Sequence, residues 1–377
     1  MDTSTPSHRV LTPRHEDQAR VLAGAFNILE QAIEQRAFPG ASIAVTHQSQ
    51  LVALKGFGRF TYEPDSPPVS AESIFDLASV SKVVATTSMA MILYQRGLLD
   101  LDAPVIGVVP EFADGNARRR EITCRMLLAH SSGLPAHEKL YLHAQSREEL
   151  IRTAMRVRLK ADPGSHTEYS DIGFIVLGLA LERVAGEPLD VFCQREVFVP
   201  LGMSQTAFNP PAAWKSRIPP TADDRTFRKR IIQGEVYDEN ASVMGGVSPQ
   251  AGVFSTAFDT ALFAEAMLSG GTPIVRRKIV RPETLAVFTR RETSPAGTSR
   301  ALGWDTPSKP SQSGKYLSEA SFGHLGYTGT SLWIDPERQL SVTLLTNRTW
   351  PDSSIRAIKE VRPRFHDAVC EALGIRS

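Results

Sequence analysis

A serine and a lysine three positions apart, Ser79 and Lys82, form the only S-x-x-K motif of the chain. They open a segment, residues 79–96, that is apolar almost all round and is followed by Gly97, which predicts a buried helix. Residues three apart share one helix face, so the Lys82 amine can approach the Ser79 hydroxyl, and the amides there favour developing negative charge. A lysine among apolar side chains is costly unless it is paired or discharged. The spacing therefore predicts Ser79 as a nucleophile with Lys82 as its proton-handling partner; the alternative is a lysine that reaches the surface.

Two further segments could complete such a site. Tyr169 lies in a turn-like stretch, residues 163–173, and a phenol near a lysine can have its pKa lowered and act as a base. Residues 323–329 are rich in glycine, which lets a substrate lie close to a strand edge whose free amide completes an oxyanion hole. Taken alone, the tyrosine could be a packing residue and the glycine run an ordinary bulge.

The elements that must position these groups lie toward both ends of the chain. Helical spacing of apolar residues predicts an amphipathic helix over residues 16–36 and another over 354–373. Runs rich in β-branched residues predict strands, two early and two late, at Ala41–Thr46, Leu51–Gly56, Thr330–Ile334 and Leu340–Thr346. Between them the pattern is mainly helical as far as about residue 244.

This order predicts an α/β (α+β) fold with an antiparallel β-sheet flanked by N- and C-terminal helices. Residues 1–80 plus 245–377 would form a discontinuous α/β domain, and residues 81–244 a mainly helical, all-α inserted domain. Residues 294–318, rich in Ser, Pro, Gly and Lys, are expected to form a long surface loop.

Composition argues against some classes of function. Lys plus Arg number 42 and Asp plus Glu 41, so no basic excess favours nucleic acid or a membrane surface. Three widely spaced cysteines form no metal-ligand pattern and indicate buried free thiols in a reducing compartment. The chain contains no apolar run of about 18 residues, so we predict no membrane span. Its first residues contain no apolar core of a secretory signal. We expect a cytoplasmic protein without a metal or other cofactor.

Together and in this order, the three segments resemble the serine β-lactamase and penicillin-binding-protein superfamily. The resemblance is closest to its class-C-like branch, which includes family VIII carboxylesterases and D-stereospecific amidohydrolases. It extends from about residue 39 to residue 348 and includes these supporting segments: residues 75–78, 97–104, 127–134, 236–241 and 251–257.

The resemblance implies a β-lactamase/transpeptidase-like fold and a role for each residue. Ser79 would attack a carbonyl carbon and become acylated, while Lys82 and Tyr169 relay its proton to the leaving group. The backbone N–H groups of Ser79 and Tyr327 would form the oxyanion hole, and Gly326 would lie beside the substrate.

Two positions depart from the family pattern. Asp171 stands where many class C β-lactamases have asparagine; facing the site, it would hold Lys82 charged and make Tyr169 the better base. The alternative is that Asp171 caps the following helix. His324 stands where those enzymes have lysine, so a permanent cation for a substrate anion is lost. We count Asp171 and His324 as substrate-binding residues and expect a neutral substrate.

Three hypotheses follow for the function. The first is a carboxylesterase acting on short-chain esters, with a possible side activity on β-lactams. The second is a β-lactamase or D-stereospecific peptidase or amidase using the same nucleophile, so the partner in either case is a small-molecule ester or amide. The third is a catalytically silent binding protein of the same fold. The sequence leaves the oligomeric state open.

Some side chains around the site carry weaker expectations. We expect His130 to make structural hydrogen bonds, whereas His137, His143 and His166 could line the entrance. Pocket walls could include the following aromatic residues: Tyr141, Trp214, Tyr237, Trp304 and Trp350.

Overall fold

The computed structural model describes residues 11–268 and 278–376. The first residues, on which the expectation about a secretory signal depends, lie outside this part. Within it, no helix is both long enough and apolar enough to cross a membrane.

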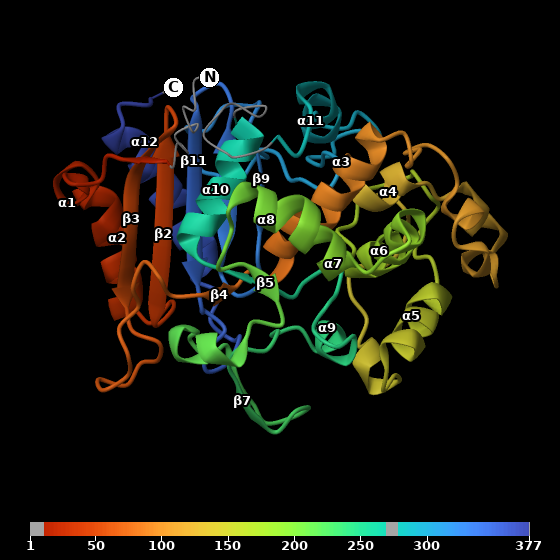
Figure 1. Ribbon diagram of the computed structural model, residues 1–377, viewed down its shortest axis with the longest axis horizontal. Helices are drawn as coiled ribbons and strands as arrows, with labels where there is room; N and C mark the ends of the chain where they lie inside the picture. The colour runs from red at the N-terminus through yellow and green to blue at the C-terminus, as the bar shows by residue number, and fades with distance from the viewer. Residues whose placement is uncertain (1–10, 269–277, 377) are drawn as a thin grey trace, which may run out of the picture.

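A six-stranded sheet in the order β1-β3-β2-β11-β10-β9 joins the two ends of the chain (Figure 1). Its strands are β1 Thr12–Pro13, β2 Gly40–His47, β3 Gln50–Gly58, β9 Phe322–Leu325, β10 Ser331–Asp335 and β11 Leu340–Thr346. β2 pairs with β11 in full, from Ala41 opposite Thr346 to His47 opposite Leu340. The predicted antiparallel sheet is confirmed; the short β1 differs because it runs parallel to β3.

Helices cover both faces of this sheet. Side chains alternate along a strand, so Ile43 and Val45 of β2 face the N- and C-terminal helices while Ala44 faces the other core. On the first face α2 Ala23–Glu34 packs against α12 Ile358–Ala372, and on the second lies α10 Ala257–Leu268 (Figure 1). The central strands β2 and β11 are buried at nearly every position because helices cover both faces of the sheet there.

Two predicted helices have different bounds. Residues 16–36 form α1 Gln18–Val21 and α2, divided at Leu22, whose φ of −102° and ψ of 19° leave the helical region. The last helix begins at Ile358 because residues 352–354 form a turn in which Asp352 accepts the Ser354 N–H.

The central block contains helices that gather beside the sheet (Figure 1). They are α3 Ser88–Gln95, α4 Cys124–Leu128, α5 Arg147–Arg156, α6 Asp171–Ala185, α7 Leu189–Cys193, α8 Val199–Leu201 and α9 Glu239–Val243, with α11 Pro282–Thr289 following later. The block is not all-α. β5 Ala207–Phe208 joins a small sheet with β4 Phe75–Asp76 and β8 Val253–Ser255, and β6 Ala222–Asp224 pairs with β7 Arg230–Ile232. Strands of two or three residues are too short for a periodic pattern. The domain boundaries at residues 80 and 244 stay a prediction.

The helix that carries the S-x-x-K motif is irregular. A 3-10 turn at Ala78–Val80 precedes a π-helical stretch at Lys82–Thr87, and only then does α3 begin. All residues of the π-helical stretch are buried, as the apolar pattern predicted, but the pattern could not indicate the wider winding.

Candidate active site

Ser79 lies in a strained turn that fixes its direction. Ala78, the residue before it, has a φ of +47°, a region that costs a residue other than glycine about 1–3 kcal/mol. The Asp76 carboxylate holds the turn by accepting the N–H groups of Ala78, at 2.8 Å, and Tyr237, at 2.7 Å. Burial raises the pKa of Asp76 to about 6, although both backbone donors act in the opposite direction.

Lys82 is fully buried and donates in three directions. Its Nζ lies 3.2 Å from Ser79 Oγ, 2.6 Å from Asp171 Oδ1 and 2.9 Å from the Gln250 carbonyl. Burial acts to lower the pKa of Lys82, but the Asp171 carboxylate and then Tyr169 outweigh it, so the net shift is upward. The lysine is therefore an ammonium group held against the nucleophile, not one that reaches the surface.

Asp171 faces the site and does not cap α6. The cap is Ser170, whose hydroxyl accepts the Gly173 N–H at 2.9 Å, while Asp171 begins the helix and points its carboxylate at Lys82. The capping alternative is therefore wrong, because the neighbouring serine already fills that role. Burial acts to raise the pKa of Asp171, but Lys82 and His137 lower it overall, so the side chain is a carboxylate.

Tyr169 stands between Lys82 and three basic side chains. Its ring lies 4.9 Å from Lys82 Nζ, 5.4 Å from the Arg300 guanidinium carbon, and 4.6 Å and 5.9 Å from the His130 and His324 ring centres. Its hydroxyl is buried and interacts with Lys82 and Ser79, without a well-aligned hydrogen bond among the described residues. Burial raises the pKa of Tyr169 more than Lys82 lowers it. The lowered pKa expected from a neighbouring lysine is therefore wrong for this site, because burial outweighs the effect of Lys82 and the Asp171 charge adds to the increase.

His324 lies in β9 at the edge of the main sheet and is only 3% exposed. Its Nδ1 donates to the Leu325 carbonyl at 2.8 Å, which leaves Nε2 as an acceptor without a hydrogen-bond partner among the described residues. Burial, reinforced by Lys82 and Arg300, lowers the pKa of His324 to about 3. The imidazole is neutral, in agreement with the expected loss of a cation here.

Residues 326–330 form a loop that presents backbone to Ser79. A Cβ on Gly326 would lie 1.9 Å from Thr330 Oγ1 and 2.5 Å from the Leu77 carbonyl, so the loop needs glycine at that position. The Arg362 guanidinium of α12 donates to the carbonyls of Gly326, Gly329 and Thr330. The backbone N–H of Tyr327 has no hydrogen-bond partner in the part of the chain that the structure describes. This leaves it available as an oxyanion donor; an oxyanion hole formed with the Ser79 N–H stays a prediction.

Two cavities meet at Ser79, Tyr169 and Tyr327. The smaller, about 340 Å³, is basic: its walls include Asp305 and five cationic side chains, those of Arg300, Arg348, Arg356, Lys359 and Arg362. The larger, about 680 Å³, is acidic and aromatic, with walls that include Tyr141, His137, Asp171, Tyr237, Asp238 and Glu239. The predicted site residues thus all line a cavity or pack directly against one that does.

Comparison with known proteins identifies the family. Residues 25–362 match the family model described as Beta-lactamase. The chain belongs to this family. A curated N-acetylmuramyl-L-alanine amidase of Bacillus subtilis (strain 168) is 32% identical over 358 residues, 85% of this chain and 80% of that protein. A putative D-alanyl-D-alanine carboxypeptidase of Escherichia coli (strain K12) is 29% identical over 381 residues, 92% and 87% of the two chains.

Solved structures support the same fold. EstCE1, described as a hydrolase with promiscuous acyltransferase activity, matches with a TM-score of 0.75 at 23% identity over 93% of this chain and 99% of that one. A class C beta lactamase matches with a TM-score of 0.73 at 17% identity over 94% and 99%. The curated relatives are named as an amidase and a putative carboxypeptidase, and the family and fold together make this chain a hydrolase of the serine beta-lactamase and penicillin-binding-protein type.

Two residues of this beta-lactamase-family site, Arg300 and Arg362, were not predicted from the sequence. Arg300 falls in the expected surface loop, and nothing local indicates that it reaches the cavity. Arg362 carried a readable signal, because it shares the apolar face of the last helix with Ile358 and Phe365. His130 accepts the Ser170 N–H at 3.0 Å, as expected for a structural histidine.

Of the histidines and aromatic residues named as entrance or wall candidates, only some reach the site. His137, Tyr141 and Tyr237 line the larger cavity. His143 lines a different cavity, Trp304 is fully buried in the core and Trp214 packs on a small separate cluster; neither cavity at Ser79 includes His166 or Trp350. Among the described residues, no cluster of His, Cys, Asp or Glu is arranged to hold a metal ion.

Proposed function

We propose that the protein is a carboxylesterase that cleaves short-chain esters through an acyl-enzyme at Ser79. The observation that carries the proposal is the contact of 3.2 Å between Lys82 Nζ and Ser79 Oγ in a turn open to two cavities. The neutral His324 supports an uncharged ester as substrate, because no permanent cation lies at that position.

The proton path follows from the protonation states. Because Tyr169 is a neutral phenol at rest, it acts as a relay: it accepts the Ser79 proton and passes its own to the leaving oxygen. Ser79 Oγ bonds to the carbonyl carbon, the bond from that carbon to the leaving oxygen breaks, and the alcohol departs. Water then attacks the acyl-enzyme, its proton returns through Tyr169 to Ser79 Oγ, and the carboxylic acid leaves. Lys82 and the Tyr327 N–H stabilise the negative charge that develops in both steps.

A fluorophosphonate probe tests the nucleophile. We expect a covalent adduct that mass mapping places on Ser79 and that Ser79→Ala abolishes. Ser81→Ala is the matched control, since that hydroxyl is occupied in accepting the Val253 N–H at 3.0 Å and should leave the adduct intact. No adduct on the folded protein would favour a catalytically silent binding protein.

Parallel turnover of p-nitrophenyl butyrate and a chromogenic cephalosporin tests the substrate class. We expect the ester to be cleaved at least tenfold faster in kcat/KM, a difference of about 1.4 kcal/mol in transition-state stabilisation. Strong cephalosporin hydrolysis with negligible ester hydrolysis would reject the esterase assignment.

A second candidate is an amide or peptide hydrolase for substrates that carry a carboxylate, as the names of the curated relatives suggest. The observation that favours it is Arg300, which lines the basic cavity, where its ion pair with Asp305 is long, at 3.6 Å, and its guanidinium lies 5.4 Å from the Tyr169 ring. This cation could replace the one lost at His324. Arg300→Gln should then raise KM for a D-alanyl-D-alanine peptide roughly tenfold and leave KM for p-nitrophenyl butyrate unchanged.

We also propose a cytoplasmic location. The support is chemical: all three cysteines are buried free thiols, which a reducing compartment preserves. Fractionation of the source cells tests it, and recovery outside the cytoplasm would reject it.

A further inference from the structure

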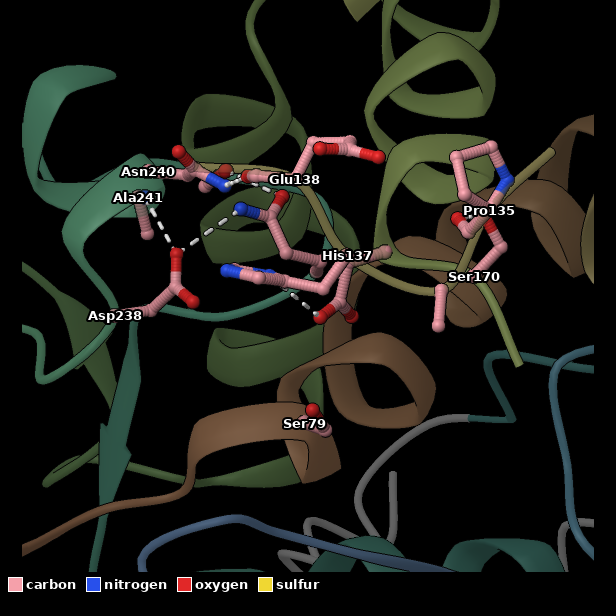
Figure 2. A network of polar contacts seen from close by, with 12 residues as sticks. Ser79, Pro135, His137, Glu138, Ser170, Asp238, Asn240 and Ala241 are labelled. Carbon is pink, nitrogen blue, oxygen red and sulfur yellow. Dashed lines mark hydrogen bonds and ion pairs between the residues drawn. The ribbon is translucent and has the colours of Figure 1, made fainter. Parts of the chain in front are cut away.

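The loop that carries His137 is fastened to the start of α6 and to α9. The Pro135 carbonyl accepts the Ser170 hydroxyl at 2.7 Å, and the Ala136 carbonyl accepts the Asp171 N–H at 2.8 Å. On the other side the Glu138 carbonyl accepts Asn240 Nδ2 at 2.9 Å. Figure 2 shows the His137 imidazole between these anchors, on the cavity side of the loop and above Ser79 in this view. These bonds fix the backbone that carries the imidazole.

From this place a chain of charged groups leads to the nucleophile. His137 Nδ1 lies 3.9 Å from Asp171 Oδ2, Asp171 Oδ1 lies 2.6 Å from Lys82 Nζ, and Lys82 Nζ lies 3.2 Å from Ser79 Oγ. The exposed fraction of the side chain falls along this chain, from 43% for His137 to 17% for Asp171 and 0% for Lys82. His137 is thus the most exposed of the three charged groups and the one in fullest contact with solvent.

The surroundings favour a proton on His137. The carboxylates of Asp171, Asp238 and Glu239 face it, whereas Lys139 of its own loop and Lys82 behind Asp171 are the cations nearby in the same site. Contact with Asp171 raises the pKa of His137, against the smaller opposing effect of burial, and the other two carboxylates add to the increase. The group therefore titrates above the ordinary value for histidine.

We propose that His137 is a positioning residue whose protonation sets how much of the Asp171 charge acts on Lys82, and thereby promotes acylation of Ser79. With His137 charged, the cluster of His137, Asp171 and Lys82 carries a net positive charge, which stabilises the oxyanion and the electron-rich Tyr169 oxygen. With His137 neutral, Asp171 balances Lys82 alone and the stabilisation weakens. The inference rests on the proposed acylation of Ser79.

The pH dependence of acylation tests this role. We compare the burst of p-nitrophenol from p-nitrophenyl butyrate between pH 5 and 9.5 in the wild type, His137→Gln and His137→Lys. The wild type should show an ionisation above the ordinary histidine value that both variants lack, and acylation at pH 6 should be roughly three- to tenfold slower for Gln than for Lys. His143→Gln is the matched control, because His143 lines a cavity without Ser79 and should keep the wild-type profile. A Gln variant whose profile superimposes on that of the wild type would overturn the proposal.

A second measurement does not need activity. Titration of the His137 imidazole by NMR should give a pKa above the ordinary value in the wild type and a lower one in Asp171→Asn. An identical titration in both proteins would overturn the inference. Failure of the proposed function would look different: a folded protein that forms no fluorophosphonate adduct on Ser79 in any variant.

Discussion

Lys82 keeps its proton because Asp171 lies beside it. With asparagine at position 171, the acceptor oxygen and the volume remain but the negative charge is lost. Burial then acts on Lys82 with Tyr169 as the remaining opposing group, so we expect the pKa of Lys82 to fall and the kcat/KM profile for esters to shift to lower pH. A discharged lysine can accept the Ser79 proton directly, so turnover of β-lactams should also rise. The pH–rate profile of Asp171→Asn measures both effects.

The loss of stability in Asp171→Asn has to be separated from its effect on the pH–rate profile. Breaking a buried ion pair costs about 3–5 kcal/mol, and the remaining amide should reduce that loss. Asp102→Asn removes the partner of Arg125 at a surface where such pairs contribute about 1 kcal/mol or less, and it should leave the pH profile unchanged. An unchanged profile in Asp171→Asn would place Asp171 outside the proton path.

At the scale of elements, α12 holds the loop at residues 326–330 in its shape. Arg362 is 5% exposed and satisfies three carbonyls of residues 326–330. Arg362→Met would leave the Gly329 carbonyl without a donor among the described residues, at about 1–3 kcal/mol for a group that stays buried. The carbonyls of Gly326 and Thr330 would each lose one of two donors and keep the N–H groups of Gly329 and Gly326. We expect a lower unfolding temperature and at least a tenfold lower kcat for esters, with a smaller change in KM, because the loop positions the transition state. Arg364→Met, two residues on and exposed, is the control and should retain the wild-type kcat.

Elements with long apolar patterns were predictable, whereas those stabilised by distant partners were not. The strands β2, β3, β10 and β11 were predictable because they contain runs of apolar and β-branched residues. The edge strand β9 has only four residues, two of them Gly323 and His324, and its pairing partner supplies the regularity.

The residues of the site also differ in whether the sequence could predict them. Ser79 and Lys82 are close in sequence, so their spacing at the start of a predicted buried helix was enough to predict their contact. Arg300 and His137 reach the site only through loops that tertiary hydrogen bonds fix, such as that from the Gly303 N–H to the Leu128 carbonyl at 3.0 Å. No local pattern encodes such a path.

For the molecule as a whole, two sets of buried titratable groups change the free energy of unfolding in opposite directions as the pH falls. Burial lowers the pKa of His366 and His324 to about 3 and that of His130 well below its ordinary value, so the folded protein keeps them neutral. Their contribution to stability is present above pH 6.5 and is lost as pH falls toward 3. Burial raises the pKa of Asp76 and Asp259 to about 6, so these carboxyls contribute stability as pH falls from 6 toward 3.8.

Two variants should therefore change the pH dependence of unfolding in opposite directions. Between pH 4.5 and 5.5 His366 takes up one proton on unfolding and Asp259 releases one, and each proton corresponds to about 1.4 kcal/mol per pH unit. Urea unfolding at these pH values gives the free energy of unfolding and its loss on acidification. For His366→Gln this loss should be smaller than for the wild type by about 1.4 kcal/mol per pH unit. For Asp259→Asn it should be larger by a similar amount. Both variants will also lower stability at every pH, because each removes a buried partner, but the slope reports only the proton. Equal slopes in all three proteins would mean that neither group changes its protonation when the chain unfolds.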